Sequence, residues 1–328
     1  MAHPRCSVIV LNWNGEAHLR ANLPAVLALD YADFEVWVVD NGSTDGSRAT
    51  VEELAAAAPP GRLRLLALRK NWGYSQGKNA GARFATGKYL WLLDCDIRPE
   101  PDSLARLVEF MESNGGQSRI AMPVLRDAAD PTRIQSAGLA FTFHGPSLSV
   151  AGALWPAGSK PYPVHAASGG ALFVSKAYWK DLGGFDRWAP FHLDDVDLGA
   201  RALIRGGSCW CVPQALAYHP PQSPEKQTPA RRRWEYRWLF QGGPAFILRN
   251  FEWKTVALML PACAAVQILQ LLKWTVLRGD WKMPWVWAQA WGALFGSRGR
   301  IRCARSRIQA RRRRRDSQFL YTRNFWRL

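Results

Sequence analysis

The sequence predicts an α/β fold in which helices flank a mixed, mainly parallel sheet, followed by a helical C-terminal region. Strand-like and helix-like runs alternate through about the first 100 residues, the pattern that parallel sheets produce. The chain has 328 residues, of which 48% are hydrophobic, enough for one large domain with a sizeable core and an appendage.

The first elements follow from residue patterns. Segments rich in Val, Ile and Trp are expected to be strands, and segments whose apolar residues recur every three or four positions are expected to be helices. The expected order is a strand at 6–11, a helix at 16–29, a strand at 34–40, a helix at 46–57 and a strand at 63–68. The segment 77–85 leads to a further strand, and residues 100–170 are less regular.

Two acidic residues follow the next expected strand. Residues 89–93 form a short apolar run, and Asp94 and Asp96 come directly after it, before Pro99 ends the strand. The carboxyl ends of parallel strands are where open α/β sheets bind ligands. Two carboxylates there repel each other unless a cation lies between them, and a divalent cation with oxygen ligands commonly holds a diphosphate. The alternative is a turn in which Asp makes only local hydrogen bonds.

Three polar, glycine-rich loops also follow strands and are expected at the same edge of the sheet. They cover residues 12–15, 40–47 and 71–81. Glycine lets the backbone approach a ligand closely, and free N–H groups at helix starts suit phosphate. Any one of these loops can be a plain turn, but several converging loops favour a ligand site.

A second acidic cluster, Asp194, Asp195 and Asp197, opens a helix that is expected to run through Ile204 and to stop at glycines 206–207. Asp at a helix N-terminus caps free N–H groups and complements the helix dipole. Three acids in four residues exceed what capping requires, so one of them is a candidate general base.

The positive charge is confined to the last third of the chain. Residues 226–328 hold 22 Lys or Arg and 4 Asp or Glu, whereas residues 1–225 hold 21 and 22, so the net charge of +17 belongs to the tail. A basic tail on a near-neutral body predicts an anionic partner. The six cysteines include no CxxC pair, which argues against a structural zinc site and is typical of reduced, cytosolic thiols. No signal peptide is expected before the first strand.

The tail has features of a membrane-contacting segment. Residues 256–277 are mostly apolar and, at about 1.5 Å per residue, long enough to cross a bilayer. Gln267, Gln270 and Lys273 recur at roughly helical spacing as a polar stripe, and both flanks are basic. These features favour a helix in the interface, or a shallow re-entrant pair, over a span. The expected headgroup contacts are the basic segment 298–315 and the rings of Trp281, Trp285, Trp287 and Trp291.

The arginine run 311–315 could instead bind nucleic acid, since attraction to phosphate is not selective. The motifs of the body give a nucleic acid no role, and the interleaved tryptophans argue against a merely solvated helix. No nucleic-acid partner is therefore expected.

Six motifs, in order, carry a resemblance to a known family. The chain resembles the family 2 inverting glycosyltransferases of the GT-A fold, most closely the rhamnosyltransferase-like branch that builds bacterial surface glycans. The resemblance covers about residues 5–225, and it is weaker to about 320. It implies a nucleotide-sugar-dependent domain at 1–225 and a membrane-interface region at 226–328. The motifs are SVIVLNWNG, VWVVDNGSTDGS, NWGYSQGKNAG, LLDCD, SGGALFVSKAYWKDLGGFD and HLDDVDLGARA.

The resemblance implies a donor site and a metal site. Asp40 corresponds to the acid that contacts the nucleotide base, with Asn12 and Trp13 beside it. Asp94 and Asp96 look like the DxD motif of the family. Asp96 would ligate Mn²⁺ or Mg²⁺ on the donor diphosphate, and Asp94 would face the ribose or the metal. The remaining residues expected to contact the nucleotide sugar are Asn71, Gly73, Lys78 and Asn79.

Asp195 matches the general base that deprotonates the acceptor hydroxyl, and Asp194 stands where the family usually has Glu. His219 lies where some relatives place a third metal ligand, although a lone histidine is more often structural. No role is assigned to His144, His165 or His192.

The implied reaction is metal-dependent transfer of one sugar from a nucleotide-diphosphate sugar, with dTDP-rhamnose suggested by the resemblance. The acceptor would be a lipid-linked or membrane-borne glycan at the cytoplasmic face of the inner membrane. Inversion needs a base opposite the departing nucleoside diphosphate and a cation that stabilises its charge.

Two rival functions remain. A processive polysaccharide synthase usually carries Gln-x-x-Arg-Trp, but Ala230 takes the glutamine position before Arg233 and Trp234. A non-catalytic membrane-bound scaffold is disfavoured by the joint presence of Asp94, Asp96 and Asp195.

Overall fold

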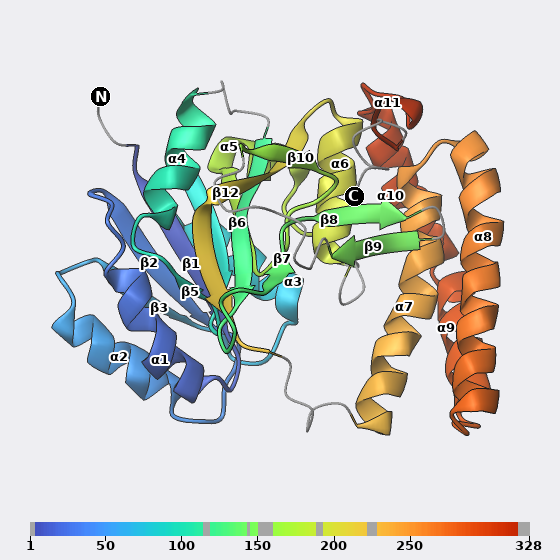
Figure 1. Ribbon diagram of the computed structural model, residues 1–328, viewed down its shortest axis with the longest axis horizontal. Coiled ribbons are helices and arrows are strands. Elements are labelled where there is room, and N and C mark those ends of the chain that lie inside the picture. Colours follow the sequence, from blue (N-terminus) through green and yellow to red (C-terminus); the bar gives the residue numbers. More distant parts are fainter. Residues whose placement is uncertain are drawn as a thin grey trace.

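The computed structural model describes residues 4–113, 119–142, 145–149, 160–187, 193–221 and 228–320. His144 and His192 lie outside the described residues. An α/β body occupies one side of the molecule, and long C-terminal helices stand beside it (Figure 1).

The body is built on one mixed sheet in the order β10-β12-β6-β11-β4-β1-β2-β3, with β5 and β7 paired at its margin. Strands β1 to β4 are mutually parallel, as the alternation of strands and helices predicts. Strand β11 is antiparallel to both β4 and β6, so β6 and its parallel partner β12 run in the same direction as β4. The carboxyl ends of β4 and β12 therefore meet at one edge. The strands of the body are β1 (Cys6–Asn12), β2 (Phe34–Asp40), β3 (Leu63–Ala67), β4 (Tyr89–Asp94), β5 (Arg98–Pro99), β6 (Arg119–Asp127), β7 (Ile134–Ser136), β8 (Leu139–Thr142), β9 (Gly145–Ser149), β10 (Tyr162–Val164), β11 (Ala171–Ser175) and β12 (Ser208–His219).

Helices cover the sheet through apolar side chains, with α3 packed on β1 and β2 and α4 packed on β6 and β12. The sheet itself is almost wholly apolar where it is covered: Val8, Ile9, Leu92 and Phe173 have no solvent exposure. The helices of the body are α1 (Glu16–Leu27), α2 (Ser47–Ala57), α3 (Tyr74–Phe84), α4 (Ser103–Ser113), α5 (Lys176–Leu182) and α6 (Asp194–Ile204). The predicted fold class is confirmed, and most of the region that sequence patterns left irregular supplies strands β6 to β10.

The C-terminal region consists of α7 (Pro229–Asn250), α8 (Trp253–Leu272) with a π-helical turn η3 (Lys273–Leu277), α9 (Met283–Gly296), α10 (Arg298–Ala310) and α11 (Ser317–Leu320). Helix α7 contacts α8, α9 and α10 and forms the centre of the group (Figure 1). The stretch Trp253–Leu277 is the one helix among the described residues that is long and apolar enough to cross a membrane.

The orientation of α8 corrects one expectation. Gln267 is buried: its amide donates to the Phe240 carbonyl at 3.1 Å, and its oxygen accepts from Trp291 Nε1 at 3.0 Å. Gln270 accepts a hydrogen bond from the Tyr236 hydroxyl at 3.2 Å. The two glutamines of the predicted stripe therefore face the neighbouring helices, because the carbonyls and ring N–H groups there need partners away from water, whereas Lys273 is exposed. The exposed large apolar residues of α8 and η3 are Trp253, Leu258, Ile268, Leu269, Leu272, Val276 and Leu277.

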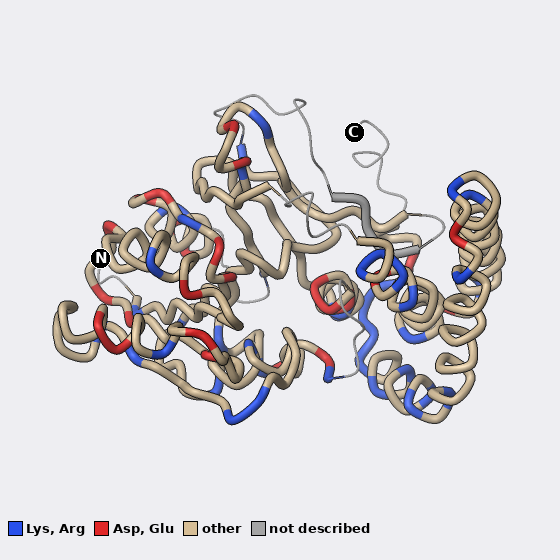
Figure 2. The backbone as a smooth tube through the Cα atoms, turned by 90° about the horizontal axis from the view of Figure 1, so that it is seen from below, with Lys and Arg blue, Asp and Glu red and all other residues tan. Residues whose placement is uncertain are grey.

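The basic tail is also more integrated than its composition suggests. Figure 2 shows many Lys and Arg residues and few acids in the helical part, whereas the body mixes both signs. Arg305 donates to the carbonyls of Leu248 and Phe251 at 2.6 and 2.7 Å. Arg312 pairs with Asp316 at 2.8 Å. Some arginines expected at lipid headgroups therefore stabilise helix ends inside the protein.

Candidate active site

The four loops that follow β1 to β4 lie at one edge of the sheet, as predicted, and side chains join them. The Asn12 amide donates to Ser43 Oγ at 3.2 Å, which links the first loop to the second. The Asn41 amide donates to Asn71 Oδ1 at 3.0 Å, which links the second loop to the third. Two tryptophans of these loops, Trp13 and Trp72, are 56% and 46% exposed. This edge of the sheet thus carries two exposed tryptophan rings on loops that hydrogen bonds hold together.

Asp94 ends β4 and is held by a lysine below it. Lys78 has no solvent exposure, and its Nζ lies 2.6 Å from Asp94 Oδ1. The same ammonium donates to the Tyr74 hydroxyl at 2.7 Å and to the Gly169 carbonyl at 2.6 Å. Because these contacts engage its three N–H groups, Lys78 orders Asp94 and has no N–H group left for a bound diphosphate. Tyr74 in turn donates to Asp94 Oδ2 at 3.3 Å.

Asp96 and His219 approach each other from β4 and β12. His219 Nε2 lies 3.5 Å from Asp96 Oδ2, although 123 positions separate them in the sequence. Burial opposes charge on both groups, but the contact between them dominates, so the pKa of Asp96 is lowered and that of His219 is raised.

Gln135 fixes the orientation of the His219 ring. Its amide nitrogen donates to the His219 carbonyl at 2.9 Å, so its Oε1 must accept from His219 Nδ1, at 2.7 Å. The Nδ1 proton is thereby assigned, and Nε2 is the ring atom that faces Asp96.

A second acidic pair opens α6. Asp195 is half-buried, and its carboxylate accepts from the Gly169 N–H at 3.0 Å and the Val196 N–H at 2.8 Å. Asp194 is buried and accepts from Ser75 Oγ at 3.0 Å. Burial raises the pKa of both carboxyl groups, and for Asp194 the charge of Asp195 adds to the effect. The pair therefore takes up a proton at a higher pH than ordinary aspartates do.

Two glycines bring the acidic groups together. A Cβ on Gly169 would lie 3.1 Å from the Tyr74 hydroxyl and 3.4 Å from Asp195 Cβ, and one on Gly170 would lie 3.2 Å from Asp94 Oδ2. Only glycine backbone thus lies between Asp94 and Asp195, and a larger residue at either glycine position would displace one of these two acids. Sequence reasoning gave Gly169, Gly170, Tyr74 and Gln135 no role; the Gly-Gly pair within a quoted motif was the available signal.

Two predicted donor residues are engaged in structural contacts. Asp40 is fully buried, and its Oδ2 lies 2.7 Å from Arg48 Nε. Asn79 exchanges two hydrogen bonds with the backbone of Phe185, at 2.8 and 3.0 Å. Asn79 therefore anchors Phe185, which follows α5. Gly73, with φ of 82°, forms the turn that starts α3, where a Cβ would meet no atom within 4 Å.

Asp96 and His219 fit a divalent cation. Asp96 Oδ1 is buried and has no hydrogen-bond partner among the described residues, and His219 Nε2 lies beside the same carboxylate. Carboxylate and imidazole suit Mn²⁺. No group of three or more His, Cys, Asp or Glu side chains in the described part of the chain is arranged to hold a metal.

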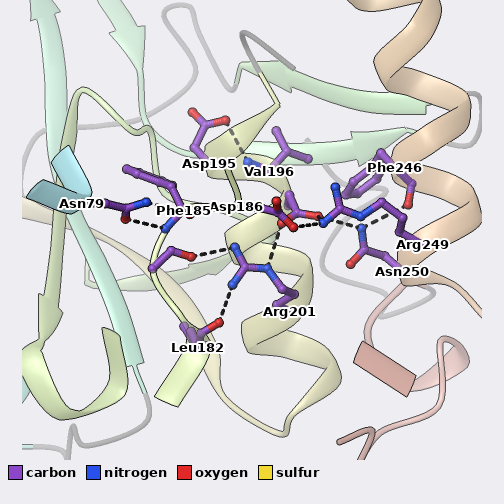
Figure 3. A network of polar contacts seen from close by, with 12 residues as sticks. Asn79, Leu182, Phe185, Asp186, Asp195, Val196, Arg201, Phe246, Arg249 and Asn250 are labelled. Atoms are coloured by element: carbon purple, nitrogen blue, oxygen red, sulfur yellow. Dashed lines mark hydrogen bonds and ion pairs between the residues drawn. The ribbon is translucent and has the colours of Figure 1, made fainter. Parts of the chain in front are cut away.

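The acids of the site are tied to the C-terminal helices by the buried network of Figure 3. Asp197 follows Asp195 on α6 and accepts from Arg201 Nε at 2.8 Å and Asn250 Nδ2 at 3.1 Å. Arg249 of α7 is 2% exposed; it pairs with Asp186 and lies 3.6 Å from Asp197. The first turn of α6 is thus held by α7.

Two family models match the chain. The model described as Glycosyl transferase family 2 matches residues 7–137, and the one described as Glycosyl transferase family group 2 matches residues 89–297, more than half of the chain. The chain is a family 2 glycosyltransferase. The enzyme class implied by its motifs is confirmed.

Curated relatives of this glycosyltransferase match over a third to three quarters of their own length. An uncharacterized glycosyltransferase of Nostoc sp., alr2836, is 34% identical over 110 residues, 34% of either chain. Succinoglycan biosynthesis protein ExoO of Rhizobium meliloti is 34% identical over 114 residues, 35% of this chain and 32% of its own. The match thus spans about a third of these relatives. N-acetylglucosaminyl-diphospho-decaprenol L-rhamnosyltransferase of Mycobacterium tuberculosis is 25% identical over 238 residues, 65% of this chain and 75% of its own.

Solved structures share the fold of the glycosyltransferase. Mannosyltransferase PcManGT from Pyrobaculum calidifontis, in complex with GDP-Man and Mn²⁺, aligns with a TM-score of 0.58 at 19% identity, over 95% of this chain and 85% of its own. S. aureus TarS 1-349 in complex with UDP-GlcNAc aligns with a TM-score of 0.57 at 16% identity, over 94% of this chain and 89% of its own.

Proposed function

We propose that this glycosyltransferase transfers one sugar, with inversion, from a nucleotide-diphosphate sugar to a lipid-linked or membrane-borne glycan. The observation that carries the proposal is the juxtaposition around Gly169 and Gly170. Asp195 lies on one side of this bare backbone and Asp94 on the other. A base and a donor-binding acid thus flank one strip of glycine backbone that a ligand can approach closely, which is where a sugar must sit for in-line displacement.

Asp96 and His219 would hold Mn²⁺ or Mg²⁺ together with the donor diphosphate. When bound, the cation stabilises the charge that develops on the departing nucleoside diphosphate. Lys78 pairs with Asp94 and fixes its position, and Tyr74 holds its second oxygen. Asp94 therefore stays in place beside the metal ligands.

Asp195 serves as the general base. It takes the proton of the acceptor hydroxyl as that oxygen bonds to the anomeric carbon and the bond to the diphosphate breaks. The N–H groups of Gly169 and Val196 aim its carboxylate before the acceptor binds. Asp194 accepts a hydrogen bond from Ser75 and lies beside Asp195, and its negative charge helps to keep the pKa of the pair raised.

The donor nucleotide would lie over the first three loops, between Asn12, Trp13 and Asn71. The exposed rings of Trp13 and Trp72 offer stacking surfaces. The mycobacterial relative named as an L-rhamnosyltransferase supports rhamnose as the transferred sugar, and the family resemblance suggests dTDP as its nucleotide. Ala230, in place of the synthase glutamine, favours addition of a single sugar.

The outward face of α8 would rest in the cytoplasmic leaflet of the inner membrane. Its exposed residues are apolar from Trp253 to Leu277, interrupted chiefly by Lys254 near one end and Lys273 near the other. Arg232 of α7 lies 4.3 Å over the Trp274 ring, so α8 cannot span the bilayer upright without carrying basic residues of α7 into hydrocarbon. An in-plane helix avoids this cost.

Metal-dependent nucleotide binding tests the donor site. We expect one of the four nucleotides UDP, dTDP, GDP and CMP to raise the melting temperature of the protein by about 5 °C at saturating concentration, and only when Mn²⁺ is present. Asp96→Ala should abolish the shift, and Asp102→Ala, which changes an exposed acid just before α4, should leave it intact. No shift with any nucleotide on folded protein would refute the donor site and favour the non-catalytic scaffold.

Gln135→Leu should weaken Mn²⁺ binding about 10- to 100-fold, because His219 loses the partner that fixes its Nδ1 proton. Titration of Mn²⁺ followed by electron paramagnetic resonance measures this directly. Nucleotide affinity at saturating Mn²⁺ serves as the control and should not change. Unchanged Mn²⁺ affinity would mean that His219 is not a ligand.

The transfer rate should depend on pH through the acidic pair. Only the ionised base accepts a proton, so on the acid limb kcat/KM should rise about tenfold per pH unit until the pair is ionised. Because burial raises the pKa of Asp195, this limb should lie above the range of an ordinary aspartate. Asp194→Asn removes a neighbouring charge and should move the limb to lower pH. If Asp194→Asn leaves the acid limb of kcat/KM at its wild-type pH, Asp194 does not contribute to the titration.

A further inference from the structure

A pocket of about 490 Å³ lies between α7 and α9, away from the acids of the proposed active site. Its cationic lining is Arg233, Arg237 and Lys282, and its aromatic lining is Trp234, Trp281 and Trp285. It lies where the chain turns from η3 into α9, beside the first turns of α7. None of the motifs that identify the family includes these residues.

Two of the three cations that line the pocket have no acidic partner among the described residues. Arg233 is neutralised by Asp280, whose oxygens lie 3.0 and 3.2 Å from its guanidinium. Arg237 and Lys282 are exposed, and the structure gives neither an ion pair within the described residues. Two uncompensated cations at one concave site favour an anion, and the planar guanidinium of Arg237 suits phosphate oxygens.

A second basic pocket, of about 590 Å³ between α5 and α10, shows the contrast. There Arg205 and Arg311 face the same acid, Asp181, at 3.0 and 3.8 Å. Its charge is partly satisfied by the protein itself, and no tryptophan lines it. Arg312 and Arg313 also line this second pocket, so both pockets keep positive charge, and the pocket between α7 and α9 differs in its tryptophan lining.

The aromatic wall of the pocket continues the outward apolar face of α8. Trp281 and Trp285 are 75% and 69% exposed, and Leu277, just before them, is 78% exposed. Exposed tryptophans beside an apolar surface are typical of the headgroup level of a bilayer. A ligand seated here would meet cations on one side and apolar surface on the other.

We infer that this pocket binds the phosphate headgroup of a membrane lipid. Arg237 and Lys282 would hold the phosphate, and the rings of Trp281 and Trp285 would lie against the start of the acyl or isoprenoid chain. This inference rests on the proposed membrane-facing orientation. Helix α7 begins ten residues after His219, and its first turns lie toward the same side of the molecule as the end of β12 (Figure 1). A lipid held there would face the side on which sugar transfer is proposed.

Vesicle sedimentation of the full chain tests the inference. The vesicles are phosphatidylcholine alone and an equimolar mixture of phosphatidylcholine and phosphatidylglycerol. The test variant is Arg237→Gln with Lys282→Gln, and the matched control is Arg83→Gln with Lys180→Gln, an exposed arginine of α3 and an exposed lysine of α5. Both variants lose the same charge at exposed positions, and melting temperatures verify that both are folded.

We expect the wild type to prefer the mixed vesicles and the test variant to bind them about thirtyfold more weakly, with a loss of about threefold or less in the control. Trp281→Ala with Trp285→Ala should weaken binding to both vesicle types. Equal losses in the two charge variants would overturn the pocket, because diffuse attraction would then explain the preference.

Inorganic phosphate distinguishes the source of the anion. If phosphate alone stabilises the wild type but not the test variant, and vesicle binding is the same for both, the ligand is a free phosphate and the lipid assignment falls. If the wild type binds neither vesicle, the membrane orientation and the pocket both fail, while the nucleotide shift still tests the donor site separately.

Discussion

Asp195→Asn is expected to lower the rate of sugar transfer by about 10²- to 10⁴-fold without loss of donor binding, because an amide cannot take the proton of the acceptor hydroxyl. The substitution keeps the size of the side chain, and the amide oxygen can still accept from the Gly169 N–H. Transfer from labelled nucleotide sugar measures the rate, and the nucleotide-induced rise in melting temperature measures donor binding.

Asp194→Asn is the matched control for this experiment, since it changes the neighbouring carboxyl and leaves Asp195 in place. It should retain most of the transfer rate at the pH optimum. A wild-type rate in Asp195→Asn would show that another group is the base. Absence of hydrolysis and transfer in the wild type under every condition would favour the scaffold.

Arg249→Met is expected to lower the free energy of unfolding by about 3–5 kcal/mol, the cost of removing the buried cation that pairs with Asp186 and leaving Arg201 as the cation of Asp197. Arg249 is 2% exposed and lies against Asp186 and Asp197. Methionine fills similar space, so loss of packing contributes little. Chemical denaturation followed by circular dichroism gives the change. The same variant should transfer sugar more slowly, because Asp197 holds the turn that carries Asp195.

Arg300→Met is the control for Arg249→Met, because Arg300 is exposed on α10 and should change stability by no more than about 0.5 kcal/mol. Arg249→Lys keeps the charge but loses the planar fork and should fall between the two. If Arg249→Met is as stable as Arg300→Met, the buried network does not hold α7 to the body.

The succession of strands along the chain, and the edge of the sheet that carries the candidate site, could be predicted from local patterns. Asp94 and Asp96 follow an apolar run, and parallel strands bring their carboxyl ends together, so a site at this edge required no knowledge of distant contacts. The approach of His219 to Asp96 is different. It depends on β12 joining the sheet through β6, a pairing between distant segments that no local pattern encodes.

Sequence position also does not reveal which atoms a polar side chain will contact through hydrogen bonds or ion pairs. Asp40 and Asn79 lie in or beside the predicted loops, but Arg48 and the backbone of Phe185 engage them. Gln267 shows the same limit on α8. Helical spacing identifies the residues that share a face, but whether that face meets water or a neighbouring helix depends on the polar groups across from it.

The shift in composition at residue 225 is not a shift in packing. Phe141 and Val196 of the body form one apolar cluster with Phe246 of α7 and with Phe251, which follows that helix. An enzyme divided at residue 225 would expose half of this cluster and would take Arg249 and Asn250 away from Asp197. Under the proposed function, the acids of the site and the surface that would meet the membrane therefore share one core, so a mutation that loosens the C-terminal helices should also slow sugar transfer.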